Sequence, residues 1–173
     1  GTSLTTGLPV TELLGPKILN SACLVLVAAV VSTIIGVTLG AVTASRRDGV
    51  LDHATSIVAL VASALPEFIV GVFVVLFLAV NLHWFPAISV LPPGQHIWDE
   101  PSKLVLPVLT LTIVVVPYIL RMCRGSVTEA LDSDYAEGAR FKGVNPRRLL
   151  YRHALPNALA PTVQVVGLSL IYL

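Results

Sequence analysis

The sequence predicts an all-α membrane protein, a polytopic bundle of transmembrane helices. Mean hydropathy is +0.85 and charged residues make up 12% of the 173 residues, whereas an average soluble domain is about a quarter charged. The apolar residues also gather in long runs, and about 20 of them in a helix are enough to cross the hydrocarbon of a bilayer. Four such runs are expected as spans: residues 18–44, 53–82, 104–120 and 157–173.

The first predicted span, residues 18–44, holds no charged residue. Along it Ser32, Gly36 and Gly40 recur every four residues, which places them on one face of a helix. Membrane helices use such strips of small residues to bring two backbones close together. We therefore interpret these three positions as a helix-packing seam.

The second predicted span, residues 53–82, contains a proline followed by an acid. Pro66 removes a backbone hydrogen bond and is expected to kink the helix. Glu67 then lies about halfway along the span, where an ionised side chain costs about 2.5–3.5 kcal/mol on insertion scales. Two interpretations remain open: Glu67 lines a translocation path, or it is paired or protonated inside the bundle without contacting the solute.

The two remaining spans are separated from the others by polar segments of different character. Residues 81–103 are rich in proline and tryptophan, which favours a loop at the membrane interface. The span at residues 104–120 is short and carries Pro107 and Pro117. The segment 121–156 is expected to be a long loop before the last span.

Basic residues predict the orientation of these spans. Of the eleven Lys and Arg residues, nine fall in the segments 45–52 and 121–156. Loops rich in Lys and Arg remain in the cytoplasm. The loop 121–156 is therefore expected to be cytoplasmic, and the segment 1–17 and the loop 81–103 extracytoplasmic.

The stretch 134–156 is the only long polar segment, and it is predicted to form two short helices with a hinge. The first runs from Asp134, as its cap, to about Lys142, and Gly143 supplies the left-handed residue that ends it. The second starts at Asn145 and Pro146, since Asn caps helices and Pro suits the first helical position. Such a polar hairpin at the membrane edge is a docking surface.

The same stretch resembles the cytoplasmic loop of ABC importer permeases, which has the pattern Glu-Ala-Ala, three residues, Gly, nine residues and Ile-x-Leu-Pro. Gly138 replaces an Ala of that pattern and His153 replaces its Ile. The surrounding residues are similar to the dipeptide, oligopeptide and nickel branch. The resemblance implies an ATPase-coupling role for Tyr135, Ala136, Glu137, Gly138, Ala139, Arg140, Lys142, Gly143, Leu155 and Pro156.

The resemblance also implies the architecture and the partners. The chain would be part of one transmembrane domain of the type I ABC importer kind, residues 18–173, and is expected to be a fragment of a longer permease in the bacterial inner membrane. Its partners would be a second homologous permease, two ATPase subunits, an extracytoplasmic solute-binding protein and membrane lipid. ATP and Mg²⁺ would be bound by the ATPases, because this chain has no phosphate-binding Gly-rich loop.

The resemblance predicts import of dipeptides or oligopeptides, driven by ATP hydrolysis in the partner subunits; a nickel or other small-solute importer is the alternative within the branch. An ion-coupled secondary transporter that uses Glu67, and a scaffold without transport activity, are alternatives from other classes. No catalytic, metal or nucleic-acid site is predicted, since His53, His83, His96 and His153 are scattered and no large basic patch is interleaved with aromatic residues.

Overall fold

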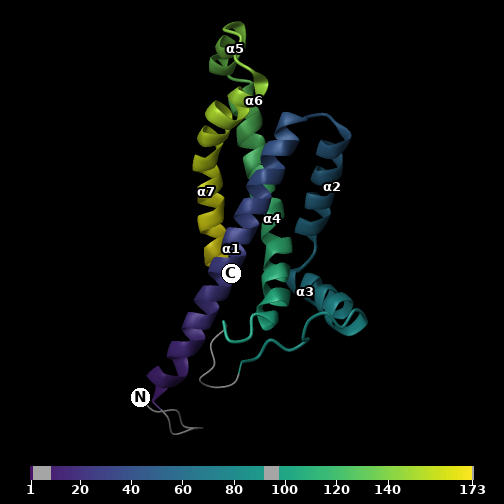
Figure 1. Ribbon diagram of the computed structural model, residues 1–173, viewed down its shortest axis with the longest axis vertical. Helices are drawn as coiled ribbons and strands as arrows, with labels where there is room; N and C mark the ends of the chain where they lie inside the picture. The colour runs from purple at the N-terminus through teal and green to yellow at the C-terminus, as the bar shows by residue number, and fades with distance from the viewer. Residues whose placement is uncertain (2–8, 92–97, 173) are drawn as a thin grey trace. The chain divides into compact units, whose positions relative to one another are not determined.

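The computed structural model describes residues 1, 9–91 and 98–172, and most of this part of the chain is helical, without a strand (Figure 1). The prediction of an all-α membrane protein is confirmed. Three helical stretches are long and apolar enough to cross a membrane: Leu14–Ser45, Ser102–Leu131 and Pro146–Ile171. The broken helix pair Val50–Ala64 and Glu67–Asn81 makes a fourth if it is counted as one span.

The helical elements follow one another in this order: α1 (Val10–Ser45), α2 (Val50–Ala64), α3 (Glu67–Val75), the π-helix η1 (Leu76–Asn81), α4 (Ser102–Leu131), α5 (Asp134–Phe141), α6 (Pro146–Leu149), the π-helix η2 (Leu150–Ala154) and α7 (Leu155–Tyr172).

Two helices extend beyond the predicted spans. Helix α1 begins at Val10, ahead of the predicted start of the first span at residue 18, and accommodates Pro16. Helix α4 continues through residues 121–131, which were assigned to the loop. The arginines of this extension bond to neighbours, Arg121 to Ser63 and Arg124 to Asp52, and therefore do not end the helix.

The kink expected at Pro66 is a complete break between two helices. Helix α2 ends at Ala64, and Leu65 has the extended backbone angles φ −81° and ψ 132°. A residue that precedes proline is driven out of the helical region by a steric clash, which explains the break. Helix α3 then starts at Glu67, which is exposed in the first turn rather than halfway along a continuous helix. An acidic side chain is favourable at a helix N-terminus because of the helix dipole.

The chain divides into two compact units, and the larger one comprises residues 29–66 and 112–173. In it α1 packs against α4 at very short range: a methyl group added at Gly36 would lie 2.7 Å from the Ile119 Cβ, and one at Gly40 would lie 2.8 Å from the Cys123 Cβ. Ser32, one turn earlier, is completely buried. The small side chains of α1 therefore face α4, as a packing seam requires.

Helix α7 completes the core of this unit. A cluster of buried side chains joins α1, α4, η2 and α7: Ala44, Cys123, Val127, Leu150, Ala154 and Ala158. Most are small, which allows close approach of three helices, and Figure 1 shows α7 beside α1 and α4 in this region. The core ends directly below α5 and α6, so it supports the segment with the predicted site.

The smaller unit comprises residues 1–28 and 67–111. In it Gly71 of α3 lies against Thr110 of α4, where an added methyl group would be 3.5 Å from Cγ2. Val70 and Val74 of α3 are buried on the same side. Lys103 pairs with Glu100 at 2.9 Å where α4 begins. His96 and part of the predicted loop, residues 92–97, lie outside the described residues.

Candidate functional site

The candidate site is the hairpin formed by α5, the turn at Gly143, and α6. Helix α5 is capped by Ser133, not by Asp134 as predicted: the Ser133 Oγ accepts a bond from the Ala136 N–H at 3.4 Å and donates one to the Ala130 carbonyl at 2.8 Å. Asp134 is instead the first residue of the helix, where its charge still complements the helix dipole. The cap links the end of α4 directly to the start of α5.

The turn between the two short helices has the predicted chemistry. Gly143 has φ +74°, in the left-handed region that favours glycine, and its N–H donates to the Arg140 carbonyl at 2.9 Å. The Asn145 Oδ1 accepts a bond from the Arg147 N–H at 2.9 Å, and Pro146 occupies the first turn of α6. Both helix ends are therefore closed by local bonds, which fixes the angle of the hairpin.

The hairpin has a buried inner face and an exposed outer face. Ala136, Leu149 and Ala154 are nearly inaccessible and rest on the core, whereas Phe141 at the tip is 84% exposed. The residues implicated by the resemblance mostly lie outside: Tyr135, Glu137, Arg140, Lys142, Gly143 and Pro156 are exposed, Gly138, Ala139 and Leu155 are half-buried, and Ala136 is buried. The hairpin thus presents an apolar tip among charged side chains.

A π-turn, which the sequence reasoning missed, joins the hairpin to α7. In η2 the Leu155 N–H bonds to the Leu150 carbonyl, five residues back, and the helix is otherwise continuous from Pro146 to Tyr172. π-Turns inside helices are frequent at functional sites. No feature of the sequence distinguishes this turn from an α-helix, although His153, which departs from the family pattern, lies within it.

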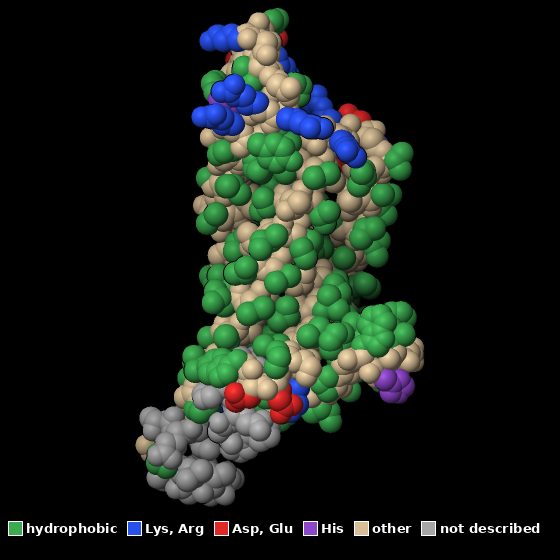
Figure 2. Space-filling model, in the orientation of Figure 1, with side chains coloured by type: hydrophobic (Ala, Val, Ile, Leu, Met, Phe, Trp, Pro, Cys, Tyr) green, Lys and Arg blue, Asp and Glu red, His purple; other side chains and the backbone are tan. Residues whose placement is uncertain are grey.

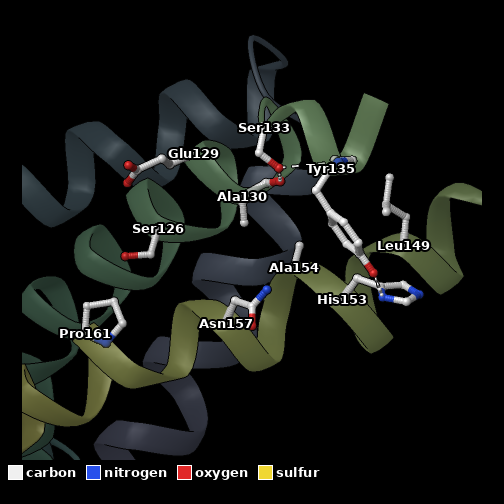
Figure 3. A pocket seen from close by; sticks show the side chains of 11 residues that line it. Ser126, Glu129, Ala130, Ser133, Tyr135, Leu149, His153, Ala154, Asn157 and Pro161 are labelled. Carbon is white, nitrogen blue, oxygen red and sulfur yellow. Dashed lines mark hydrogen bonds between the residues drawn. The ribbon is translucent and has the colours of Figure 1, made fainter. Parts of the chain in front are cut away.

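His153 connects this turn to α5. The Tyr135 hydroxyl lies 2.9 Å from the His153 Nδ1, and the two rings are 5.7 Å apart. Figure 3 shows Tyr135 reaching from α5 to His153 over a cavity of about 370 Å³. Residues of α4, α5 and α7 line it, among them Glu129, Ser133 and Asn157. The first turn of α5 is therefore held both by α4 and by η2.

Two ion pairs fasten the turn between α1 and α2 to α4, and the sequence analysis did not predict them. The Arg124 Nε and Nη2 atoms contact the two carboxylate oxygens of Asp52 at 2.5 and 2.6 Å, and the Asp48 N–H adds a bond of 3.1 Å. Arg47 and Asp132 form the second pair, 2.6 Å apart. Asp52 is 1% exposed, while the Arg47 and Asp132 side chains are half-exposed. The α1–α2 turn and the start of α2 supply Arg47 and Asp52, and α4 with the residue that follows it supplies Arg124 and Asp132, so each side contributes one acid and one base.

Glu67 belongs to the smaller unit, and no hairpin residue does. Its side chain is exposed and forms no hydrogen bond or ion pair with the described part of the chain. Among the described residues, no three His, Cys, Asp or Glu side chains are grouped so that they could hold a metal ion. The hairpin is therefore the best-formed candidate site.

The chain matches the family model described as "Binding-protein-dependent transport system inner membrane component" over residues 36–173. It is 32% identical to the probable peptide ABC transporter permease protein y4tP of Sinorhizobium fredii, over all of this chain and 55% of that protein. It is 31% identical to the oligopeptide transport system permease protein AppB of Bacillus subtilis, over 98% of this chain and 55% of that protein. With the dipeptide transport system permease protein DppB of Bacillus subtilis, identity is 36% over 81% of this chain and 43% of that protein.

The chain spans about half the length of these curated relatives. The family model nevertheless covers most of the chain, from Gly36 of the α1–α4 seam through the whole hairpin. On these grounds the chain belongs to the family of binding-protein-dependent transport system inner membrane components.

Proposed function

We propose that the protein is the transmembrane permease subunit of an ATP-driven importer for dipeptides or oligopeptides. Family membership makes it a transport subunit of an ABC system. The peptide substrate is supported by the names of relatives that match nearly the whole chain, which are peptide, oligopeptide and dipeptide permeases. A nickel importer has no such support among these relatives.

The structure of the hairpin supports the proposed mechanism. Its outer face is exposed, its inner face rests on the core, and its angle is fixed by the bonds at Gly143 and Asn145. A surface of this kind can transmit force because it does not deform when a partner presses on it. We assign the tip to an ATPase subunit that binds ATP and Mg²⁺, two of which would act with a second homologous permease and an extracytoplasmic solute-binding protein.

Charge supports the proposed orientation in a bacterial cell membrane. Figure 2 shows Lys and Arg side chains gathered at the end of the molecule that carries α5 and α6. Loops rich in basic residues stay in the cytoplasm. The hairpin would therefore face the cytoplasm, where ATP is available, and the loop 81–103 would be extracytoplasmic.

Movement of the hairpin would reach the membrane helices by two connections. Ser133 joins α5 to α4, and η2 joins α6 to α7 without an interruption of the helix. Alternating access then requires that ATP-driven closure of the partners favours one of two arrangements of these helices. Glu67 is retained as a candidate for the translocation path, because an exposed carboxylate without a described partner is available to a cationic peptide terminus.

The test uses the full-length permease in its complete complex, reconstituted in liposomes. We expect Glu137→Arg to abolish peptide uptake and the stimulation of ATP hydrolysis by substrate, since it reverses an exposed charge on the docking face. Gly143→Pro is expected to do the same, because proline cannot adopt φ +74°. Asp99→Arg, an exposed charge reversal in the smaller unit that belongs to neither the hairpin nor the lining of its cavity, is the control and should retain uptake.

Two results would contradict the proposal. Uptake that persists in Glu137→Arg and Gly143→Pro would show that energy does not enter through the hairpin. Uptake that survives ATP depletion, but is lost with the proton gradient and in Glu67→Gln, would instead identify an ion-coupled carrier. Copurification of the ATPase with wild type, and its loss in the hairpin variants, would support the assigned partner.

A further inference from the structure

A second cavity, of about 550 Å³, lies on another side of the hairpin, and Arg140 is the only one of its lining residues that belongs to the set assigned to ATPase coupling. Its volume falls within the range of about 300–1,000 Å³ that small-molecule sites occupy. Segments far apart in the sequence line it: Val42, Ser45, Arg46, Leu131, Arg140, Pro146, Arg147, Leu149, Leu150 and Tyr151. We call it the arginine cavity.

The lining of the arginine cavity is amphiphilic. Three guanidinium groups, from Arg46, Arg140 and Arg147, line it together with aliphatic side chains such as Val42 and Leu150, and the lining contains no carboxylate. Neither Arg46 nor Arg147 forms an ion pair with a residue that the structure describes. Arginine is suited to phosphate because its planar fork donates several hydrogen bonds at once. A ligand that satisfies both parts of the lining carries a phosphate next to apolar groups.

The position of the arginine cavity indicates where such a ligand comes from. The three candidate membrane spans end at Ser45, end at Leu131 and begin at Pro146, and all three of these residues line the cavity. Each of these helices is longer than the roughly 20 residues needed to cross the hydrocarbon, so their shared end extends into the headgroup region. Basic pockets between membrane helices on the cytoplasmic side are known to bind anionic headgroups.

We propose that the arginine cavity binds one anionic phospholipid, with its phosphate on Arg46, Arg140 and Arg147 and its first methylene groups on the aliphatic lining. The inference uses the proposed orientation only to place the site in the cytoplasmic leaflet; the chemistry of the cavity is independent of peptide transport. The occupied site joins α1, the end of α4, α5 and α6 through a single ligand. Lipid composition would then affect how firmly the hairpin is held.

The test is native mass spectrometry of the full-length permease complex in detergent, titrated with phosphatidylglycerol or phosphatidylcholine. Each basic residue near an anionic lipid contributes about fivefold in affinity, equivalent to about 1 kcal/mol. Arg46→Gln with Arg147→Gln should therefore weaken phosphatidylglycerol binding about 25-fold. The matched control is Arg148→Gln with Arg152→Gln, which removes two exposed arginines of the same segment that do not line the cavity, and it should change binding less than threefold.

Equal weakening by the two pairs would overturn the site, because it would show surface attraction alone. Glycerol 3-phosphate is the probe for a water-soluble anion: if it displaces phosphatidylglycerol at equal concentration, the cavity binds free phosphate and not a lipid. Binding that appears only when the ATPase subunits are absent would indicate that an acidic protein segment occupies the cavity, and this too would refute the proposal.

An independent measurement does not depend on removing arginines. Tyr151 lines the cavity and is 60% exposed, so Tyr151→Trp reports directly on what enters it. Phosphatidylglycerol brominated next to the headgroup should quench its fluorescence more strongly than brominated phosphatidylcholine at the same bromine density in nanodiscs. Equal quenching by the two lipids would mean that the cavity does not select the charge.

Discussion

The ion pair between Arg124 and Asp52 makes the sharpest prediction about stability, because the two partners are buried to different degrees. Asp52 is 1% exposed, and among the described residues its carboxylate bonds only to Arg124 and to the Asp48 N–H. Arg124→Ala therefore leaves a buried charge with one hydrogen bond. Breaking a buried pair in this way costs about 3–5 kcal/mol, so the ratio of folded to unfolded protein should fall by about a hundredfold to a few thousandfold.

Removing the Asp52 carboxylate should reduce the free energy of unfolding less than removing the Arg124 guanidinium. The Arg124 side chain is 32% exposed, so in Asp52→Ala its guanidinium can turn toward water. The expected loss is about 1.5–3 kcal/mol, the value of hydrogen bonds to a charged group. Arg47→Ala is the matched control, since the Arg47 and Asp132 side chains are 51% and 48% exposed, and exposed pairs contribute about 0.2–1 kcal/mol.

The assay is unfolding of the full-length permease in mixed micelles at increasing mole fraction of dodecyl sulfate, followed by circular dichroism. The free energy of unfolding should decrease in the order wild type, Arg47→Ala, Asp52→Ala, Arg124→Ala. A loss at Arg47 equal to that at Arg124 would refute the argument that burial determines the size of the effect. Equal losses at Asp52 and Arg124 would refute the asymmetry between the two partners.

Three further substitutions test the packing and the cap. Gly40→Ala should reduce the free energy of unfolding by about 1–3 kcal/mol, because its methyl group would lie 2.9 Å from the Leu120 carbonyl of α4. Gly125→Ala is the control in the same unfolding assay. Its methyl group would meet no described atom within 4 Å, so the substitution should be neutral or stabilising by up to about 1 kcal/mol. Ser133→Ala should destabilise α5 by about 1 kcal/mol and lower peptide uptake in liposomes, because the helix loses its N-cap. Ser133→Asp should restore both the stability and the uptake, since Asp is also a good N-cap. If neither recovers in Ser133→Asp, loss of the cap is not the cause. Ser32→Ala should leave unfolding unchanged or make it harder, because the Ser32 hydroxyl is buried without a partner among the described residues, and a loss above about 1 kcal/mol would reveal a partner elsewhere.

Local chemistry explains what could be predicted from the sequence. A left-handed glycine and an Asn-Pro helix start depend on a few adjacent residues, and both lie where they were expected, at Gly143 and Asn145. The break at Pro66 was likewise foreseen, although its completeness was not. Glycines spaced by four residues predicted a close helix contact, and Gly36 and Gly40 lie against α4. Each of these features requires only the geometry of one segment.

Features that depend on distant pairs could not be predicted from this sequence. Arg124 and Asp52 are 72 positions apart, and Arg47 and Asp132 are 85 positions apart. Read locally, these charges indicated the ends of membrane spans, and for that reason the predicted third span ended at residue 120 whereas α4 continues to Leu131. A charge that finds a partner on a neighbouring helix no longer marks the end of its own helix. The π-turn η2 is similar, because its residues have no composition that distinguishes them from an α-helix.

These missed features surround the hairpin, and together they determine how it can move. At one end, two residues separate α5 from the end of α4. The pairs Arg124–Asp52 and Arg47–Asp132 connect this end of α4 to the α1–α2 turn and the start of α2. At the other end, the hairpin continues through η2 into α7. A force applied to the tip under the proposed function therefore acts on α4 and α7 at the same time, and the ion pairs pass it to α1 and α2. The element able to yield is η2, where the extra residue of a π-turn weakens the regular bonding between two rigid helices.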